Sequence, residues 1–385
     1  MEAKFKPLNF IIILGLVSLF ADMVYEGARG VLSPFFFYLG ASSLMTGFIF
    51  GIAEFLGWAL RIFFGWFADR FKCWWQMTFL GYGLGVLSIP LLAFTKNLQA
   101  ASILVIFERL GKAIRSPSRD LLISSVTEEF GRGKAFGLHE FFDQIGAISG
   151  PILVGILFFL SRDYRISFGF LFLPAIICLL VLNFAFKRYT LPFISEVRQK
   201  DTSYRKLPLR FWWYSFFTLF TVMGFLNFPL IAYHLKSRYI LSESIISIWF
   251  GLGMGIDALT ALVAGRLYDL KGLISLLSIP FLNIPLVFLG LSFNPKFILT
   301  AIILWGIIMG IQETIMRAEV ADLVSIEKRG LAYGIFNSLY GLGIFLSLSI
   351  MGFLYRFSFN YIITFTIITQ IISLPFLFLI KKEES

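Results

Sequence analysis

Long apolar segments follow one another along the whole chain, and short polar or charged stretches separate them. A helix that crosses a bilayer needs about 20 predominantly apolar residues. Glycine, proline and charged residues mark the ends of the segments, as expected where helices end. The pattern predicts twelve spans, over residues 8–38, 43–68, 74–95, 98–124, 133–160, 166–187, 209–236, 243–266, 272–293, 296–322, 328–355 and 359–380. The predicted fold class is an all-α integral membrane protein with twelve transmembrane helices.

The composition agrees with this class, because 58% of the residues are hydrophobic and 15% are charged. Soluble domains are about 25% charged. The net charge of +10 would indicate nucleic acid in a soluble protein, but here the basic residues gather mostly in loops on one side, so we expect no nucleic-acid partner. The two cysteines, Cys73 and Cys178, lie far apart without metal-ligand spacing. We therefore expect free thiols, no metal and no cofactor.

The distribution of lysine and arginine predicts the orientation in the membrane. Cytoplasmic loops carry an excess of these residues. With the N-terminus inside, most of them fall in the even-numbered loops and at both termini. The first apolar segment lacks a small-residue cleavage site and is predicted to be the first span. The sequence thus predicts a multi-pass protein of the cytoplasmic membrane with both termini in the cytoplasm.

The longest polar loop divides the spans into two sets of six. It is basic, contains two prolines and includes the charged run 196–206. We predict an N-terminal six-helix bundle over residues 1–188, a cytoplasmic linker over 189–208 and a C-terminal six-helix bundle over 209–385.

The two halves repeat each other in sequence. Gly65-Trp-Phe-Ala-Asp69 after the second span recurs as Gly265-Arg-Leu-Tyr-Asp269 after the eighth. Arg132–Gly137, which opens the fifth span, likewise recurs as Arg329–Gly334, which opens the eleventh, at nearly the same offset. Two matches at one offset indicate a duplication. Parallel six-span halves with a site between them near the midplane are a transporter architecture.

These segments resemble the motifs of the major facilitator superfamily, and the resemblance covers essentially the whole chain. They are the span 2–3 signature Gly65-x-x-x-Asp69-Arg70, the span-4 arginine motif Arg109-Leu-Gly-Lys-Ala, the span-5 motif Gly146-x-x-x-Gly150-Pro151, and the Arg-Gly pairs at Arg132 and Arg329. Two positions depart from the family pattern, since Phe71 replaces a usual glycine and Lys112 stands where glutamine is common. The whole is similar to the prokaryotic twelve-span branch of drug/proton antiporters.

The resemblance implies two pseudo-symmetric six-helix bundles, alternating access and a central cavity lined in part by spans 1 and 2. The span-5 motif is associated with antiporters and favours export. A primary pump is not expected, because the chain has no Gly-x-x-x-x-Gly-Lys-Ser/Thr phosphate loop. An enzyme is not expected either, since His139 and His234 are predicted at opposite membrane faces and cannot share a site. A transport-inactive sensor would lack a soluble tail through which to signal.

Span 1 carries three charged residues, Asp22, Glu26 and Arg29, on one helical face. Two carboxyl groups close together in a cavity of low dielectric can share a proton, so one of them can titrate near neutral pH. We predict that Asp22 and Glu26 couple transport to protons. The alternative is a static ion pair between Glu26 and Arg29 that holds span 1 in place.

Span 4 carries a charged stripe, because Glu108, Lys112, Arg115 and Arg119 recur at helical spacing. A charge at the bilayer centre costs about 3 kcal/mol on insertion scales, so the stripe must face protein or water. The end of the stripe near the midplane, with Glu108, Arg109 and Lys112, is predicted to meet solute. The cytoplasmic end is predicted to form an inner gate.

The remaining candidates fall into the same two groups. For the substrate cavity they are Arg29, Glu54, Asp257, Gln312, Glu313 and Asn337. For the gate and signature motifs they are Gly65, Asp69, Arg70, Arg115, Arg119, Asp120, Arg132, Asp143, Gly146, Gly150, Pro151, Asp269 and Arg329. Arg115 is expected to pair with Asp69 or Asp143. His139 shares a face with Asp143 and is either a pH sensor or a structural hydrogen bonder. Tyr25 is a candidate for the outer mouth or an interfacial anchor.

The predicted function is secondary active transport of a small solute by alternating access, with proton-coupled efflux as the leading form. The alternative is proton-coupled uptake of a polar or anionic solute. Arg29, Arg109, Lys112 and Arg115 support this alternative, because an excess of cations in the cavity suits carboxylate or phosphate groups. The expected partners are a small-molecule substrate, protons and membrane lipid, and a monomer is expected.

Overall fold

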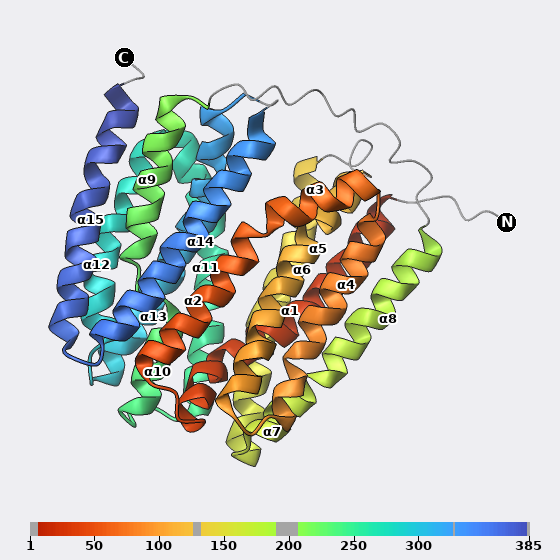
Figure 1. Cartoon of the computed structure of the whole chain (residues 1–385), viewed down its shortest axis with the longest axis horizontal. Coiled ribbons are helices and arrows are strands. Elements are labelled where there is room, and N and C mark those ends of the chain that lie inside the picture. Colours follow the sequence, from red (N-terminus) through yellow and green to blue (C-terminus); the bar gives the residue numbers. More distant parts are fainter. Residues whose placement is uncertain (1–6, 126–131, 190–206, 326–327, 383–385) are drawn as a thin grey trace. The chain divides into compact units, whose positions relative to one another are not determined.

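A computed structural model describes residues 7–125, 132–189, 207–325 and 328–382 of the chain (Figure 1). Every regular element in these ranges is a helix, which confirms the predicted all-α class. Ten helical segments are long and apolar enough to cross a membrane. One of them, Glu243–Gly290, contains two predicted spans, and the charged helix over 98–124 is a further predicted span that is not among the ten. The helices are therefore consistent with twelve spans.

The described residues group into two units, and the first comprises those of 1–29 and 60–199. It contains the first part of α1 (Pro7–Tyr38), followed by α3 (Arg61–Phe71), α4 (Trp74–Ser88), η1 (Pro90–Phe94), α5 (Leu98–Ser124), α6 (Arg132–Ser161), α7 (Tyr164–Phe170) and α8 (Phe172–Arg188). Within this unit α4 packs along α5, and α3 and α8 also contact this pair.

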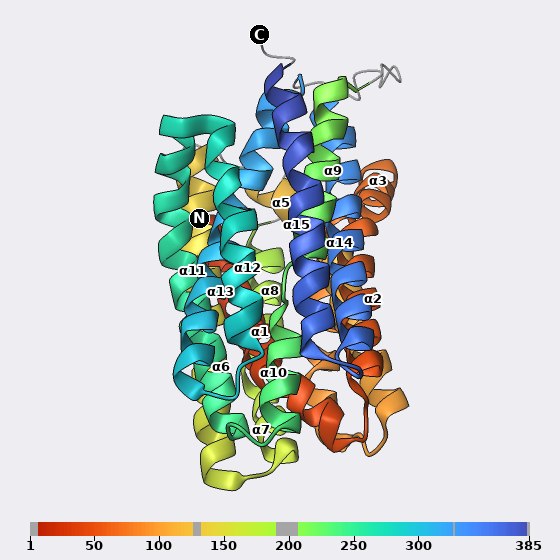
Figure 2. The same ribbon diagram turned by 90° about the vertical axis from the view of Figure 1, so that its left-hand side faces the viewer.

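The second unit comprises residues 30–59 and the described part of 200–385. It contains the end of α1, α2 (Ser43–Ala59), α9 (Leu209–Met223), α10 (Phe228–Ser237), α11 (Glu243–Lys271), η2 (Gly272–Leu277), α12 (Ser278–Gly290), α13 (Pro295–Leu323), α14 (Arg329–Leu354) and α15 (Phe359–Lys382). In this unit α9 lies beside α15, as Figures 1 and 2 show, and α11 packs against α13. The predicted bundle limits at 188 and 209 stay a prediction, and linker residues 190–206 lie outside the described ranges.

Several predicted spans are interrupted within the membrane segment. The seventh span is divided into α9 and α10, because α9 ends at Met223 with Gly224 as its C-cap, and Pro229 lies in the first turn of a new helix. Proline lacks the N–H that a helix interior needs but fits the first turn. The second span is divided into α2 and α3 around Leu60. Apolar length predicts where a span lies, whereas these breaks depend on local backbone geometry.

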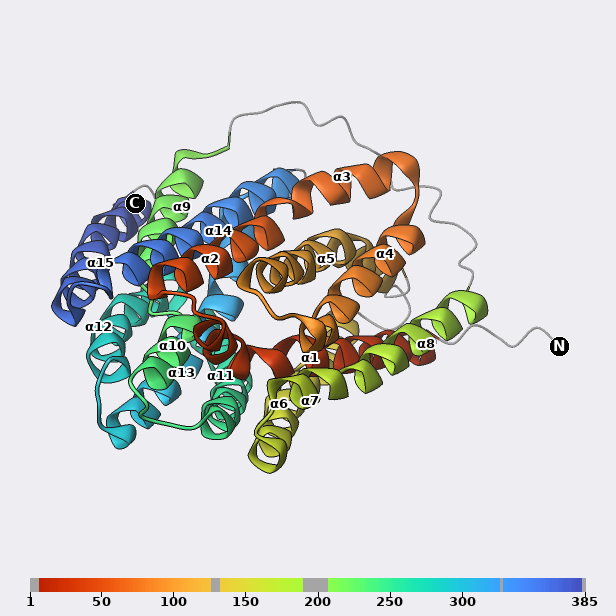
Figure 3. The ribbon, with the colours of Figure 1, turned by 60° about the horizontal axis from the view of Figure 1, so that its bottom comes forward.

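Small residues bring α2 and α14 together in the second unit (Figure 3). The Ser43 hydroxyl donates to the Gly352 carbonyl at 2.8 Å. A Cβ on Gly352 would lie 2.6 Å from the Ser43 carbonyl oxygen, and one on Gly47 would collide with the Leu348 carbonyl. Glycine at a helix interface allows such close backbone contact.

The repeat extends to the backbone at the ends of two helices. Lys72 caps α3 with φ 53°, and its N–H donates to the Ala68 carbonyl. Gly272 ends α11 with φ 55°. Lys72 and Gly272 are separated by the same number of residues as Gly65 and Gly265, so they are equivalent positions of the repeat. Both positions have a positive φ, but ψ is 37° at Lys72 and −141° at Gly272, so only Lys72 is in the left-handed helical conformation, and it carries a Cβ.

Replacing Lys72 by glycine is expected to raise the free energy of unfolding by about 1 kcal/mol, because a residue with a Cβ is strained in the left-handed conformation. Unfolding of the purified protein in mixed micelles by a denaturing detergent measures this difference. Lys72→Ala is the matched control, since alanine removes the lysine side chain but keeps the Cβ. An equal gain for both variants would contradict the backbone explanation.

Candidate functional site

Helix α5 carries the charged stripe of the first unit. Asn97 caps its start by accepting a hydrogen bond from the Ala100 N–H at 2.8 Å. Glu108, Arg109 and Arg115 are buried, with 3%, 6% and 1% of their surface exposed. The stripe therefore faces protein, as the cost of a charge in lipid requires.

Arg115 lies between two tyrosine rings in place of the expected carboxylate. Its guanidinium carbon is 5.0 Å from the ring centre of Tyr25, on α1, and 4.4 Å from that of Tyr82, on α4. The arginine Nε and Nη2 have no hydrogen-bond partner among the described residues. Such cation–π contacts hold a buried cation without neutralising its charge. Arg115 thus presents an uncompensated pair of donors inside the unit.

Glycines of α4 make room for this arrangement. A Cβ on Gly81 would lie 2.6 Å from Cβ of Arg115, and one on Gly85 would lie 2.8 Å from the Tyr25 hydroxyl oxygen. Residues 81 and 85 are one turn apart and therefore share a face of the helix. The small residues of α4 thus allow α5 to bring its arginine between the rings.

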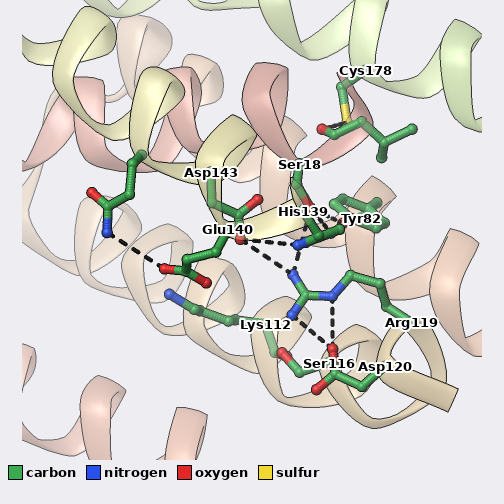
Figure 4. Close-up of polar contacts among 12 residues, drawn as sticks. Ser18, Tyr82, Lys112, Ser116, Arg119, Asp120, His139, Glu140, Asp143 and Cys178 are labelled. Carbon is green, nitrogen blue, oxygen red and sulfur yellow. Dashed lines mark hydrogen bonds and ion pairs between the residues drawn. The ribbon is translucent and has the colours of Figure 1, made fainter. Parts of the chain in front are cut away.

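Arg119 is the centre of a polar network one turn further along α5 (Figure 4). Its Nε and Nη2 donate to Asp120 Oδ1 at 3.0 and 2.8 Å, and its Nη1 lies 3.9 Å from Asp143 Oδ2. His139 lies 3.5 Å from the same Asp143 oxygen through Nδ1. Its Nε2 is hydrogen-bonded to Ser18 at 2.9 Å. The network joins α1, α5 and α6, and Arg119 rather than Arg115 is next to Asp143.

Asp22 lies where α1 and α6 are in close contact. A Cβ on Gly146 would collide with the Leu19 carbonyl and lie 3.1 Å from Cβ of Asp22. One on Gly150 would lie 2.6 Å from the Met23 carbonyl oxygen. The glycines of the Gly146-x-x-x-Gly150-Pro151 motif thus allow α6 to pack closely against the α1 segment that carries Asp22 and Glu26.

The charges around Asp22 come from three helices, since Asp143 of α6 also interacts electrostatically with Asp22. Lys112, Arg115 and Arg119 of α5 are cations whose fields act on its carboxyl group, and Glu26 of α1 is an acid. Gain or loss of one proton at Asp22 therefore changes the charge balance of the whole cluster.

The other predicted charges of this unit pair locally. Arg29 Nε lies 3.1 Å from Glu26 Oε2, which is the ion pair considered as the static alternative for span 1. Arg109 Nε lies 3.2 Å from Glu108 Oε2. Lys112 is half-buried on the same helix. These local ion pairs do not test whether Glu26 takes part in proton coupling or whether Arg29, Glu108, Arg109 and Lys112 bind solute, so those roles stay predictions.

The signature positions occupy helix ends. Asp69 accepts a hydrogen bond from the Trp74 indole at 2.9 Å, and a Cβ on Gly65 would lie 3.3 Å from Pro117 of α5. In the second unit, Arg329 Nη2 donates to the Ala321 carbonyl at 2.8 Å and so caps the end of α13. Arg70 and Asp269 are exposed. Arg132 begins α6, but its side chain lies outside what the structure describes.

The second unit contains a separate cluster of polar and aromatic side chains. The Tyr340 hydroxyl donates to Gln312 Oε1 at 3.1 Å. Its ring meets that of Trp58 edge-on, with ring centres 5.1 Å apart. The guanidinium carbon of Arg317 lies 5.6 Å from the Trp58 ring centre. These residues line a small hollow together with Glu313 and Phe336.

The remaining cavity candidates lie in the same unit. Asp257 is 1% exposed on α11, and the charges of Asp257, Glu54 and Glu313 all act on the Tyr340 hydroxyl. Asn337 is half-buried on α14. The structure therefore brings together Glu54, Asp257, Gln312 and Glu313 around one tyrosine.

No pattern in the sequence indicates which aromatic residues contact the charged side chains. Tyr25, considered for the outer mouth, is 1% exposed and lies against Arg115. Tyr82, Trp58 and Tyr340 stand in apolar runs where most aromatic residues serve packing. Their contacts depend on how neighbouring helices are rotated. Within the described ranges, no group of three or more His, Cys, Asp or Glu residues is placed to hold a metal ion.

Comparisons with known proteins find a family profile and relatives that match most of the chain. The sequence profile described as Major Facilitator Superfamily matches residues 14–347, with a second match over 217–385. An uncharacterized protein of Mycobacterium tuberculosis is 36% identical over 380 residues, covering 97% of this chain and 93% of the relative. An uncharacterized MFS-type transporter of Methanocaldococcus jannaschii is 27% identical over 363 residues, covering 90% of this chain and 88% of the relative.

Solved structures show the same fold at low identity. The nucleoside transporter NupG superposes with a TM-score of 0.72 at 15% identity, covering 97% of this chain and 98% of NupG. A bacterial homolog of the human lysosomal transporter Spinster, inward-facing and unoccupied, superposes with a TM-score of 0.76 at 14% identity, covering 99% of this chain and 98% of the homolog.

Proposed function

Because the chain belongs to the Major Facilitator Superfamily, we propose that it exports a small solute in exchange for protons, which bind at Asp22 and Glu26. Members of this family are secondary transporters that work by alternating access, so the chain is a multi-pass membrane transporter and not an enzyme. The direction of transport and the use of protons are the proposal.

The position of Asp22 carries the proposal. This carboxyl group is next to the glycine contact between α1 and α6 and in the field of three α5 cations. An ionised Asp22 is attracted to those cations, whereas a protonated one is not. Protonation therefore changes the relative free energies of the arrangements that α1, α5 and α6 can adopt, and a ligand that favours one arrangement shifts the population toward it.

In alternating access, the binding site opens either to the cytoplasm or to the outside. Exchange requires that solute and proton favour different ones of these two states. In the proposed cycle, solute binds when Asp22 is ionised, and protonation displaces it. The network of Arg119, Asp120, Asp143 and His139 is the proposed inner gate. Its ion pairs join α5 to α6, the hydrogen bond between His139 and Ser18 joins α6 to α1, and these contacts must rearrange when the helices move.

Proton-coupled uptake of an anion is the second candidate, and Arg115 favours it. The donors Nε and Nη2 without a described partner suit a carboxylate or phosphate. An anion would approach the α5 cations more easily when Asp22 is protonated. Proton and anion would then bind together, which is symport.

A dye that reports lumenal pH separates the two forms. Purified protein is reconstituted into liposomes that contain pyranine, with valinomycin and potassium to clamp the voltage, and solute is added outside at equal pH. Entry in exchange for protons raises the lumenal pH, whereas entry with protons lowers it. The solutes are uridine, chosen because NupG is a nucleoside transporter, benzoate as an anion and tetraphenylphosphonium as a lipophilic cation.

Asp22→Asn is expected to abolish the pH change, because an amide cannot bind and release the proton. Asp22→Glu keeps a carboxyl group and should retain part of the signal, and protein-free liposomes give the background. A lumenal pH rise that is the same for the wild type and for Asp22→Asn would contradict coupling at this residue. A fall in lumenal pH larger than that in protein-free liposomes would contradict exchange and would show symport.

A further inference from the structure

A cavity of about 440 Å³ lies in the second unit and shares no lining residue with the hollow around Tyr340. It is formed where α9 begins, where α11 passes into η2, and near the ends of α13 and α15. Binding pockets for small molecules have volumes of about 300–1,000 Å³. The cavity is thus large enough for the headgroup of a lipid and the first part of its chains.

One part of the wall is cationic. Arg210 is half-buried in the first turn of α9, and Lys271 is the exposed last residue of α11. Arginine and lysine are the usual partners of phosphate oxygens. Gly272, with φ 55°, turns the chain directly after Lys271, so η2 continues along the same wall.

Another part of the wall is anionic. The Tyr268 hydroxyl lies 2.7 Å from Glu319 Oε2 and 2.7 Å from Asp322 Oδ2, and it can donate its one proton to either carboxylate. A phenol has one proton, whereas a primary ammonium group has three N–H donors. Two carboxylates held around one hydroxyl therefore form a surface that an ammonium group complements.

The rest of the wall is apolar. Ile274 of η2 and Phe378 of α15 are 51% and 63% exposed, and Leu277 and Leu377 also line the cavity. Large exposed apolar side chains on a membrane-spanning unit face the hydrocarbon of the bilayer. Hydrocarbon chains can lie along this part of the wall while a headgroup occupies the charged part.

We propose that this cavity binds a phospholipid with a primary amine, phosphatidylethanolamine. Its phosphate would bind Arg210 and Lys271, its ammonium group would bind Glu319 and Asp322, and its chains would lie against η2 and α15. Two cations beside two carboxylates match a zwitterion better than a lipid with a purely anionic headgroup. The site is separate from Asp22 and from the Tyr340 cluster, and binding can be measured without transport.

Native mass spectrometry of the full chain in detergent micelles tests the headgroup. The protein is titrated with dioleoyl phosphatidylethanolamine, phosphatidylcholine and phosphatidylglycerol, and the bound lipids are counted. Phosphatidylethanolamine is expected to bind about tenfold more tightly than phosphatidylcholine, whose quaternary ammonium group has no N–H, and than phosphatidylglycerol, which has no amine. Equal binding of all three lipids would overturn the proposal, as would preference for phosphatidylglycerol.

Variants locate the binding. Lys271→Gln and the double variant Glu319→Gln with Asp322→Asn should each weaken phosphatidylethanolamine about tenfold and reduce its advantage over phosphatidylcholine. Lys187→Gln, at an exposed lysine in the last turn of α8, is the matched control and should bind as the wild type does. Should the double variant fail to fold, exposed Lys271 still provides the test. Unchanged binding in Lys271→Gln overturns the site.

Free phosphoethanolamine separates a lipid site from a site for the headgroup alone. It offers the same phosphate and ammonium groups without chains, so it should compete with the lipid at least about a hundredfold more weakly if the apolar wall contributes. Competition at equal concentration would show a site for a soluble phosphate ester and would overturn the assignment to lipid.

Discussion

Gly146→Val is expected to destabilise the protein by about 3 kcal/mol and to reduce transport at least about tenfold. A Cβ at this position collides with the Leu19 carbonyl, and the nearest atoms are backbone, which cannot rotate away. Relief requires α6 to move from α1, and this displaces the contact beside Asp22. The free energy of unfolding and the initial rate of the pyranine signal measure the two effects.

Gly137→Val is the matched control for this prediction. Gly137 lies on the same helix, is exposed, and has no atom within 4 Å of the position that a Cβ would take. The same substitution there should leave transport unchanged. Equal losses at both positions would show that valine acts through helix propensity and not through the contact between α1 and α6.

Arg115→Lys is expected to lower the free energy of unfolding by about 2 kcal/mol, although it keeps the charge. The guanidinium carbon lies over the rings of both Tyr25 and Tyr82, whereas the ammonium group of lysine is compact and strongly hydrated. Arg115→Gln removes the cation next to Asp22 and should reduce the pyranine signal at least about tenfold. Unfolding in mixed micelles and proton movement in liposomes separate these effects.

Arg165→Lys controls for the chemistry of the substitution, because Arg165 is exposed at the start of α7. It should match the wild type in both measurements. Tyr82→Phe keeps the ring but removes the hydroxyl that lies 3.0 Å from Ser18 Oγ, so it should preserve more stability than Tyr82→Leu. Equal stability of these two variants would contradict the stacking explanation.

The twelve predicted spans are consistent with the described helices, because the length of an apolar segment is a local property set by bilayer thickness. The predicted span 98–124 has the same bounds as α5. The family was also evident from sequence, since its motifs consist of glycines and charges that stand out in apolar helices. The burial of Glu108, Arg109 and Arg115 could be predicted in the same way from the cost of a charge in lipid.

The partners of those charges were less accessible to sequence reasoning. Arg115 was expected to pair with Asp69 or Asp143, yet the structure places it between two tyrosines, and Arg119 is the residue beside Asp143. Arg115 and Arg119 are one helical turn apart on the same face of α5, so the spacing of charges in the sequence is equally compatible with either of them contacting Asp143. Which of them reaches a carboxylate depends on the position of α6 along α5, which the period of the charges leaves open.

The sequence by itself determined the class, the spans, the duplication and the charged stripe, because each follows from local composition and period. Tertiary structure alone decided that Ser18 contacts His139, that the Tyr82 ring lies next to the Arg115 guanidinium, and that Trp58 lies by Arg317. These contacts join residues far apart in the chain. They depend on the rotation and the depth of each helix, which apolar periodicity leaves open when both sides of a helix are apolar.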